Sequence, residues 1–174
     1  MAIEETIHFK RVWTITRYPS DEHFVKGTPG KCWDPVAEKW LDEVSVFEGN
    51  LLLNEGIQLM EDLLIGAGGS AYNNANTYLG VGDSSVAEAA TQTGLQAATN
   101  KLWKPMQASF PSRATQTVTW QAQFTGTDAN YAWAEFTIVN ASSDTGTNLN
   151  RKVSAQGTKT AGQTWTLSMT LTIS

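Results

Sequence analysis

The chain has little of the chemistry on which most enzymes and metal proteins depend. Its 174 residues include a single cysteine, Cys32, and two histidines, His8 and His23. A lone cysteine excludes an internal disulfide and a cysteine-rich zinc site. Nucleophilic catalysis needs a base close to the nucleophile, and neither histidine lies beside a strained nucleophile turn. We therefore interpret the chain as a non-enzyme and expect no catalytic residues, no cofactor and no metal ion.

Charge is scarce as well, and no basic cluster stands out. Charged residues make up 17% of the chain and the formal net charge is −5, whereas about 25% charged residues is usual. A protein that neutralises phosphates needs a basic face. Nucleic acid is therefore not expected as a partner.

Long apolar runs are absent too. No stretch approaches the ~20 residues that a membrane-spanning helix needs. Glu4, Glu5 and His8 occupy the region where an export signal would have its apolar segment. We expect a soluble protein that is made in a cytoplasm and has no membrane partner.

What the chain has in place of charge is Thr, Ser, Asn, Gln and Gly, which favour strands and turns over a helical bundle. The clearest strand is 163–174, in which large apolar residues alternate with Thr and Ser. The stretches 116–124 and 131–139 repeat this alternation. Strands separated by polar turns, without helical crossovers, predict a mainly β fold. We expect an antiparallel β-sandwich or jelly-roll-like domain over residues 50–174.

The tryptophans of these strands fall into two groups. Trp120 and Trp165 share a face with apolar neighbours and are expected in the core. In the stretch 131–139, Tyr131, Trp133 and Glu135 alternate with the residues that are expected to face the core, so these three side chains are expected to point outward. Glu135 is interpreted as a carboxylate on the solvent or contact face. An exposed aromatic pair is typical of a protein interface or of a platform for stacking sugar rings.

One helix is predicted over residues 54–65, with Asn54 as its N-cap and the glycines from Gly66 onward as its end. An apolar stripe with spacings of three and four runs along it: Ile57, Met60 and Leu64. A single helix of about three turns cannot form a core alone. We expect the stripe to cover an open face or end of a sheet.

Residues 1–49 carry most of the charge and are predicted to form a partly extended N-terminal arm. The stretch 6–16 alternates like a strand, and 34–46 is interpreted as a short helix capped by Asp34. An arm this rich in aromatic residues has to pack on its own domain or on a neighbour. We expect it to contact a neighbouring subunit. Its candidate interface residues are Trp13, Phe24, Trp33 and Trp40, and the candidates in the sandwich are Tyr131 and Trp133.

Four short segments carry a resemblance to known proteins. They are FEGNLLLNEGI at 47–57, YNNAN at 72–76, LGVGD at 79–83 and NLNRK at 148–152. Together they make residues 47–174 similar to small structural proteins of tailed bacteriophages. These motifs lie at turns and helix boundaries, so they identify a fold better than a role.

The resemblance implies a virion component without catalytic residues. It suggests a head decoration or cement protein that binds and stabilises the capsid through protein–protein contacts. The partners would be the major capsid protein or other virion proteins, and identical copies would associate as a homo-oligomer. The protein would be made in the host bacterial cytoplasm and reside in the virion.

An alternative is a neck or tail structural protein, or a receptor-binding domain with carbohydrate-binding capacity. In that case Tyr131 and Trp133, joined by Trp103, would stack on sugar rings. Binding to glycans would distinguish this alternative from a scaffold.

Overall fold

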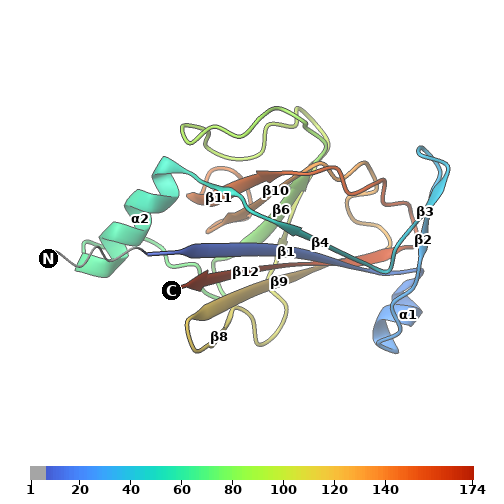
Figure 1. Cartoon of the computed structure of the whole chain (residues 1–174), viewed down its shortest axis with the longest axis horizontal. Coiled ribbons are helices and arrows are strands. Elements are labelled where there is room, and N and C mark those ends of the chain that lie inside the picture. Colours follow the sequence, from blue (N-terminus) through green and yellow to red (C-terminus); the bar gives the residue numbers. More distant parts are fainter. Residues whose placement is uncertain (1–6) are drawn as a thin grey trace, which may run out of the picture.

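A computed structural model describes residues 7–174 and shows a mainly β chain whose antiparallel sheets pack as a sandwich (Figure 1). The first sheet has the strand order β4-β1-β12-β9-β8. Its strands are β1 (Phe9–Tyr18), β4 (Val44–Glu48), β8 (Ser112–Ala114), β9 (Thr117–Phe124) and β12 (Thr164–Ile173). The predicted antiparallel sandwich is confirmed.

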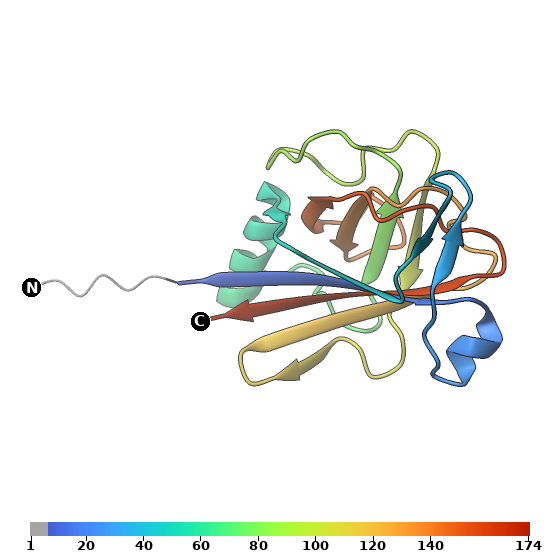
Figure 2. The ribbon, with the colours of Figure 1, turned by 45° about the vertical axis from the view of Figure 1, so that its right-hand side comes forward.

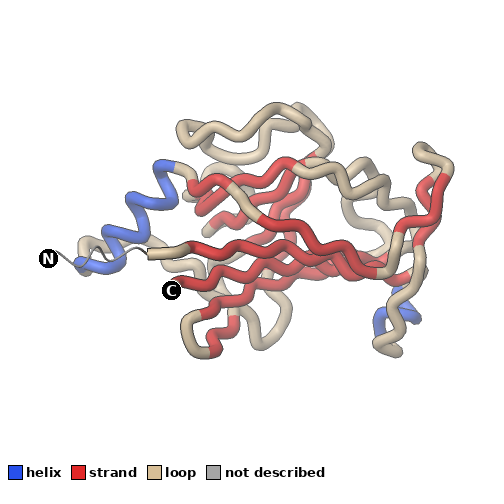
Figure 3. The backbone as a smooth tube through the Cα atoms, in the orientation of Figure 1, coloured by secondary structure: helices blue, strands red, loops and turns tan. Residues whose placement is uncertain are grey.

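The second sheet has the order β5-β11-β10-β6-β7. Its strands are β5 (Leu51–Leu52), β6 (Tyr78–Gly82), β7 (Lys101–Pro105), β10 (Glu135–Val139) and β11 (Asn148–Val153). The chain crosses from β4 to β5 over Gly49 and Asn50, a short loop between two strands (Figure 3). Met106 after β7 forms a bridge with Ala122 in β9. The sheets are therefore connected both on the β4–β5 side and on the β7–β9 side.

Aromatic side chains fill the space between the sheets. Trp133 lies at the centre, with its ring centroid 4.8 Å from those of Phe124 and Trp165 and 6.3 Å from that of Phe136. Phe136 in turn lies 5.8 Å from Trp13. None of these five side chains has exposed surface. Burying a large apolar side chain contributes about 1.5–3 kcal/mol, so this cluster is a major part of what holds the two sheets together.

The predicted arm over residues 1–49 is not separate from the sandwich. Strand β1 lies inside the first sheet, where it forms ten residue pairs with β12 and five with β4. Alternate residues of such a central strand point into the core, and Trp13 and Ile15 are fully buried there. Trp13 is thus a core residue, and its expected role at an interface is wrong. Residues 1–6 of the predicted arm lie outside the described residues.

The predicted helix over 34–46 is also wrong. The segment forms the turn and second strand of a hairpin, β2 (Cys32–Asp34) and β3 (Lys39–Leu41), and then enters β4. Asp34 does accept the N–H groups of Val36 and Ala37, as a helix N-cap would. The chain then turns back at Glu38, whose φ is 49°, because a helix cannot continue through a left-handed residue.

The prediction of an outward face for Trp133 and Glu135 is wrong as well. Loop 83–100 covers the outer face of the second sheet, so every residue of β10 is buried (Figure 1). Glu135 accepts the N–H groups of Gln96 and Ala97 at 2.9 and 2.7 Å, which fixes the loop on the sheet. Trp133 precedes the regular strand, so the alternation does not extend to it, and its indole N–H donates to Ala129 O at 3.0 Å.

Helix α2 (Asn54–Ile65) is confirmed close to its predicted bounds. It ends at Gly66, which adopts a left-handed φ of 73° that favours glycine. The N-cap is Leu53 and not Asn54, and it makes no side-chain capping bond. The second helix, α1 (Asp21–Val25), was not predicted; its cap Ser20 accepts the His23 N–H at 3.3 Å.

The packing of α2 differs from the predicted stripe. Gly56 and Leu59 are its buried residues. Of the predicted stripe, Met60 packs partly buried against the core, whereas Ile57 and Leu64 are 36% and 86% exposed. A Cβ at Gly56 would lie 2.5 Å from Leu149 O in β11. The helix therefore approaches the sheet through a glycine, because no larger side chain fits between the two backbones.

Lys159 is a buried cation that holds the loop after β9. Its Nζ donates to Thr125 O at 2.7 Å and to Asp128 O and Asn130 Oδ1 at 2.9 Å. Burial lowers the pKa of the Lys159 ammonium to about 8, with partial compensation from the nearby carboxylates. Three oxygen acceptors satisfy all of its donors, so the side chain acts as a structural anchor.

Candidate interaction site

The hairpin of β2 and β3, residues 32–41, presents two tryptophans on its outer face, and we call it the tryptophan hairpin. Trp33 and Trp40 lie opposite each other in the strand register, with ring centroids 5.5 Å apart at 64°. The adjacent pair, Cys32 and Leu41, is buried in the core. Because strand residues alternate between faces, burial of this pair turns both tryptophans outward. Trp33 is 42% exposed and Trp40 is 62% exposed.

Asp34 anchors the hairpin on the body of the sandwich. One carboxylate oxygen accepts the turn N–H groups of Val36 and Ala37, and the other accepts the Thr158 N–H at 2.8 Å. Burial by itself would raise the pKa of Asp34, but these hydrogen bonds outweigh it and hold the pKa below its ordinary value. The Gln163 amide also donates to Trp33 O at 3.0 Å. The tryptophans are thus carried by a fixed platform.

Helix α1 lies at the same end of the molecule as the hairpin (Figure 2). Phe24 of this helix is half-buried and packs edge-on against Tyr18, with ring centroids 5.2 Å apart. Val25 and Val36, from α1 and the hairpin turn, are 83% and 77% exposed. We call residues 19–43 the hairpin end. Its exposed apolar side chains extend beyond the tryptophan pair.

A cleft of about 240 Å³ lies beside Trp40. Its lining includes side chains that can form hydrogen bonds and ion pairs as well as the indole: Arg17, Lys39, Trp40, Asp42, Ser45 and Gln156. A flat aromatic ring next to such polar groups can hold a side chain of a protein partner or a sugar ring.

Arg17 forms the inner wall of this cleft. Its guanidinium lies over the Trp165 ring at 4.5 Å and donates to Asp42 O, Ser45 Oγ and Gln156 O at 2.7–2.8 Å. Burial lowers the pKa of Arg17 to about 10, against opposing contributions from Cys32 and Asp42. Arg17 therefore remains a cation at neutral pH. It ties β1 to the loops on both sides of the cleft.

The structure separates the six predicted interface residues. Trp33 and Trp40 are brought together on one exposed face, and Phe24 lies on α1 at the same end. Trp13 and Trp133 are core residues. The sixth, Tyr131, is partly buried and donates its hydroxyl to Val81 O at 3.1 Å. No pattern in the sequence marks Arg17, which is buried although it lies on the same strand as the exposed Lys10.

Within residues 7–174, no group of three or more His, Cys, Asp or Glu side chains is arranged to hold a metal ion. No described helix has the length and apolar character needed to cross a membrane. No protein-family model, curated protein or solved structure gives a significant match to the chain. The candidate site is therefore defined by its own geometry, an exposed aromatic pair on a rigid hairpin beside a polar cleft.

Proposed function

We propose that the protein is a non-enzymatic structural component of a tailed-bacteriophage particle, a head decoration or cement protein that binds the capsid through the tryptophan hairpin. The exposed pair of Trp33 and Trp40 carries the assignment to protein binding. The assignment to a virion rests on the sequence resemblance over residues 47–174.

Two physical arguments support a binding role for the hairpin. Tryptophan is enriched among the residues that dominate binding energy at protein interfaces, where it fills a desolvated pocket. The hairpin is also preorganised, because the hydrogen bonds of Asp34 and Gln163 fix it to the body of the sandwich. A platform that is already ordered loses little conformational entropy when a partner binds.

Particle binding tests the proposal. Recombinant wild-type chain and the Trp33→Ala/Trp40→Ala variant are added to particles of the encoding phage assembled without this protein, and the bound fraction is measured against concentration. Truncating one interface hot-spot tryptophan costs about 2 kcal/mol or more, so the double variant should weaken binding at least about thirtyfold even if only one of the two is a hot spot. Since both side chains project from the surface, the variant should unfold at the wild-type temperature.

Val86→Ala provides the matched control. Val86 is 55% exposed and lies in loop 83–100, away from the hairpin, so its loss should leave particle binding unchanged. Equal binding by wild type and the double tryptophan variant would remove the hairpin from the mechanism. Failure of the wild type to bind any part of the particle would contradict the virion assignment itself.

A specific observation favours carbohydrate binding by a neck, tail or receptor-binding protein as the second candidate function. The sugar-stacking platform that the sequence predicted for this function cannot form, because Trp133 is buried. The cleft beside Trp40 offers a replacement, with Asp42 and Gln156 available as hydrogen-bonding groups. Binding to a glycan array that is lost in Trp40→Ala would favour this candidate. The absence of binding on a broad array would favour the scaffold.

A further inference from the structure

The two sheets end in four edge strands, and three of these edges are protected against pairing with another strand. In the second sheet, β5 has only two residues, and β7 carries Lys101, Lys104 and Pro105. In the first sheet, β8 has three residues, all of them exposed. Very short strands, lysine and proline are features with which proteins keep sheet edges from pairing.

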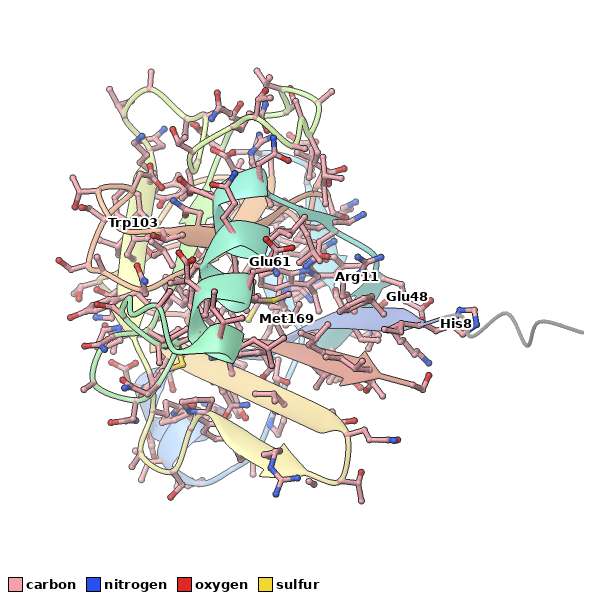
Figure 4. All side chains as sticks on the ribbon, turned by 90° about the vertical axis from the view of Figure 1, so that its left-hand side faces the viewer. His8, Arg11, Glu48, Glu61, Trp103 and Met169 are labelled. Atoms are coloured by element: carbon pink, nitrogen blue, oxygen red, sulfur yellow. The ribbon has the colours of Figure 1, made fainter. Side chains whose placement is uncertain are left out.

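The fourth edge, β4, lacks this protection. Its sequence Val-Ser-Val-Phe-Glu contains neither lysine nor proline, and Val44 and Val46 are 44% and 63% exposed on the outer face of the sheet. Its one charged residue is Glu48, whose Oε1 lies 3.9 Å from Lys10 Nζ on β1. Glu48 lies beside Arg11 at the margin of the sandwich (Figure 4). A flat edge with exposed β-branched residues is open to a further strand.

The main-chain groups of β4 that face away from β1 have no partner. At one end the Arg17 N–H donates to Glu43 O at 2.8 Å, and at the other the Gly49 N–H donates to Arg11 O at 2.9 Å. The odd-numbered residues of this register therefore bond to β1, and the residues between them direct their N–H and C=O groups to the open side. These residues are Val44, Val46 and Glu48. Neither a strand nor a side chain within residues 7–174 bonds to their main-chain groups. A row of donors and acceptors repeating every two residues matches an extended polypeptide.

The open edge is continuous with the tryptophan hairpin. The hairpin ends at Leu41 and β4 begins at Val44 (Figure 1). Ser45 of β4 faces inward, where its Oγ accepts from Arg17, and it lines the cleft beside Trp40. Residues opposite each other in neighbouring strands point to the same face. The residue of an added strand opposite Ser45 would therefore point toward this cleft.

The cleft has the size for one side chain. Its volume of about 240 Å³ lies below the ~300–1,000 Å³ that is usual for small-molecule pockets. One wall is the Trp40 ring, against which a large side chain can pack.

We infer that the partner inserts an extended segment beside β4, as a further strand of the first sheet, and places one large side chain in the cleft beside Trp40. The inference rests on the proposed function, in that the partner is the particle protein that binds the tryptophan hairpin. Residues of the segment opposite Val44 and Val46 lie on the outer face of the sheet, where apolar side chains extend the contact with the two valines. The segment therefore has the pattern apolar, large, apolar over three consecutive residues.

A second copy of this chain does not supply such a segment through its own β4. The inward-facing residues of β4 are Ser45, which is small, and Phe47, which packs on Trp13 and Phe136 of its own core. A two-fold pairing of two β4 edges would therefore leave the cleft empty. Such a pairing would be detected as a dimer in the absence of any particle.

Val46→Pro tests the inference in the particle-binding assay. Proline removes the Val46 N–H, which faces away from β1, so the ladder with β1 is kept and an added strand is blocked. Binding to particles assembled without this protein should weaken at least about tenfold. Val46→Thr is the matched control, because it keeps both the branched side chain and the N–H, and its binding should stay within about twofold of wild type. Both variants should unfold near the wild-type temperature.

Hydrogen exchange of the wild type gives a second readout that needs no variant. The amides of Val44, Val46 and Glu48 should exchange rapidly in the free chain and at least about tenfold more slowly on the particle. Unchanged exchange in β4 on the particle, or full binding by a folded Val46→Pro chain, would overturn the inference.

The two tryptophans and the β4 edge can fail separately. Loss of binding in Trp33→Ala/Trp40→Ala together with full binding by Val46→Pro would leave the proposed function standing and reject the added strand. Loss of binding in Val46→Pro alone would reject the role of the hairpin and keep the added strand. A wild-type dimer in sedimentation velocity that Val46→Pro abolishes would assign the edge to a second copy and overturn the inference, and a wild type that does not bind the particle would overturn both proposals.

Discussion

Glu135 and Arg151 form an ion pair in which Oε2 and Nη2 are 2.7 Å apart and neither side chain has exposed surface. Arg151 also donates to Val86 O at 2.9 Å, and Glu135 accepts two N–H groups of the same loop. The pair thus connects β10 and β11 to loop 83–100. It stabilises the covered outer face of the second sheet, where an open sheet would otherwise meet water.

Arg151→Met should destabilise the fold by about 3–5 kcal/mol, since it leaves the buried Glu135 carboxylate without its cation. Urea unfolding measures the loss as a lower midpoint. The double variant Glu135→Gln/Arg151→Met should recover part of it, because the uncompensated buried charge is gone. A wild-type midpoint for Arg151→Met would show that the pair does not hold the loop.

Asp34 should make the stability depend on acid pH. Its pKa in the folded chain lies below the unfolded value of about 3.9, so as the pH falls the unfolded state binds the proton first. The stabilisation is complete above about pH 3.9 and is lost as the pH falls through the folded pKa. Unfolding free energies of wild type and Asp34→Asn between about pH 6 and 2 should converge in acid. Curves that run parallel over this whole interval would contradict the lowered pKa of Asp34. The control is Glu38→Gln, at an exposed position, which should follow the wild-type curve.

Trp133→Ala and Trp40→Ala should differ strongly in their effect on the stability of the fold. Trp133 is fully buried against Phe124 and Trp165, so its truncation should cost about 3–5 kcal/mol of stability. Trp40 is 62% exposed, and its truncation should change stability by no more than about 0.5 kcal/mol. Thermal unfolding of the two variants measures the contrast. Similar losses in both would mean that the hairpin tryptophan is part of the core.

Gly56→Ala should destabilise the protein even though alanine favours helices. The added Cβ would meet Leu149 O at 2.5 Å, and such overpacking costs about 1–3 kcal/mol, more than the gain of up to ~1 kcal/mol in helix propensity. Gln58→Ala, at an exposed position of the same helix, should change stability by less than about 0.5 kcal/mol. A chemical denaturation series compares the three chains. A more stable Gly56→Ala protein would show that α2 can move away from β11.

The strands with one apolar and one polar face were predictable from the sequence. The alternation over 163–174 and 116–124 places Trp165 and Trp120 in the core, as the structure has them. Helix α2 and its end at Gly66 were also predictable from the sequence, since glycine is the usual residue where a helix ends in a left-handed backbone conformation. In these elements the local pattern and the tertiary environment agree.

The candidate site was only partly predictable. Trp33 and Trp40 were identified as candidates, but the segment between them carried a helix-cap signal at Asp34 that the structure uses for a turn. The same residue types cap helices and close turns, because both require an oxygen that accepts backbone N–H groups. The pairing of Cys32 with Leu41, whose side chains are buried against the core, determines that a hairpin turn forms here and not a helix.

The sequence by itself determined that this is a mainly β protein with few charges, one helix of 12 residues and seven tryptophans, because these follow from composition and period. The tertiary structure decided which aromatic residues are inside. Trp13 is buried because β1 lies between β4 and β12, and β10 is buried on both faces because a distant loop folds over it. Such burial depends on what lies across from a residue in space, and a pattern along one strand records only which side of that strand the residue faces.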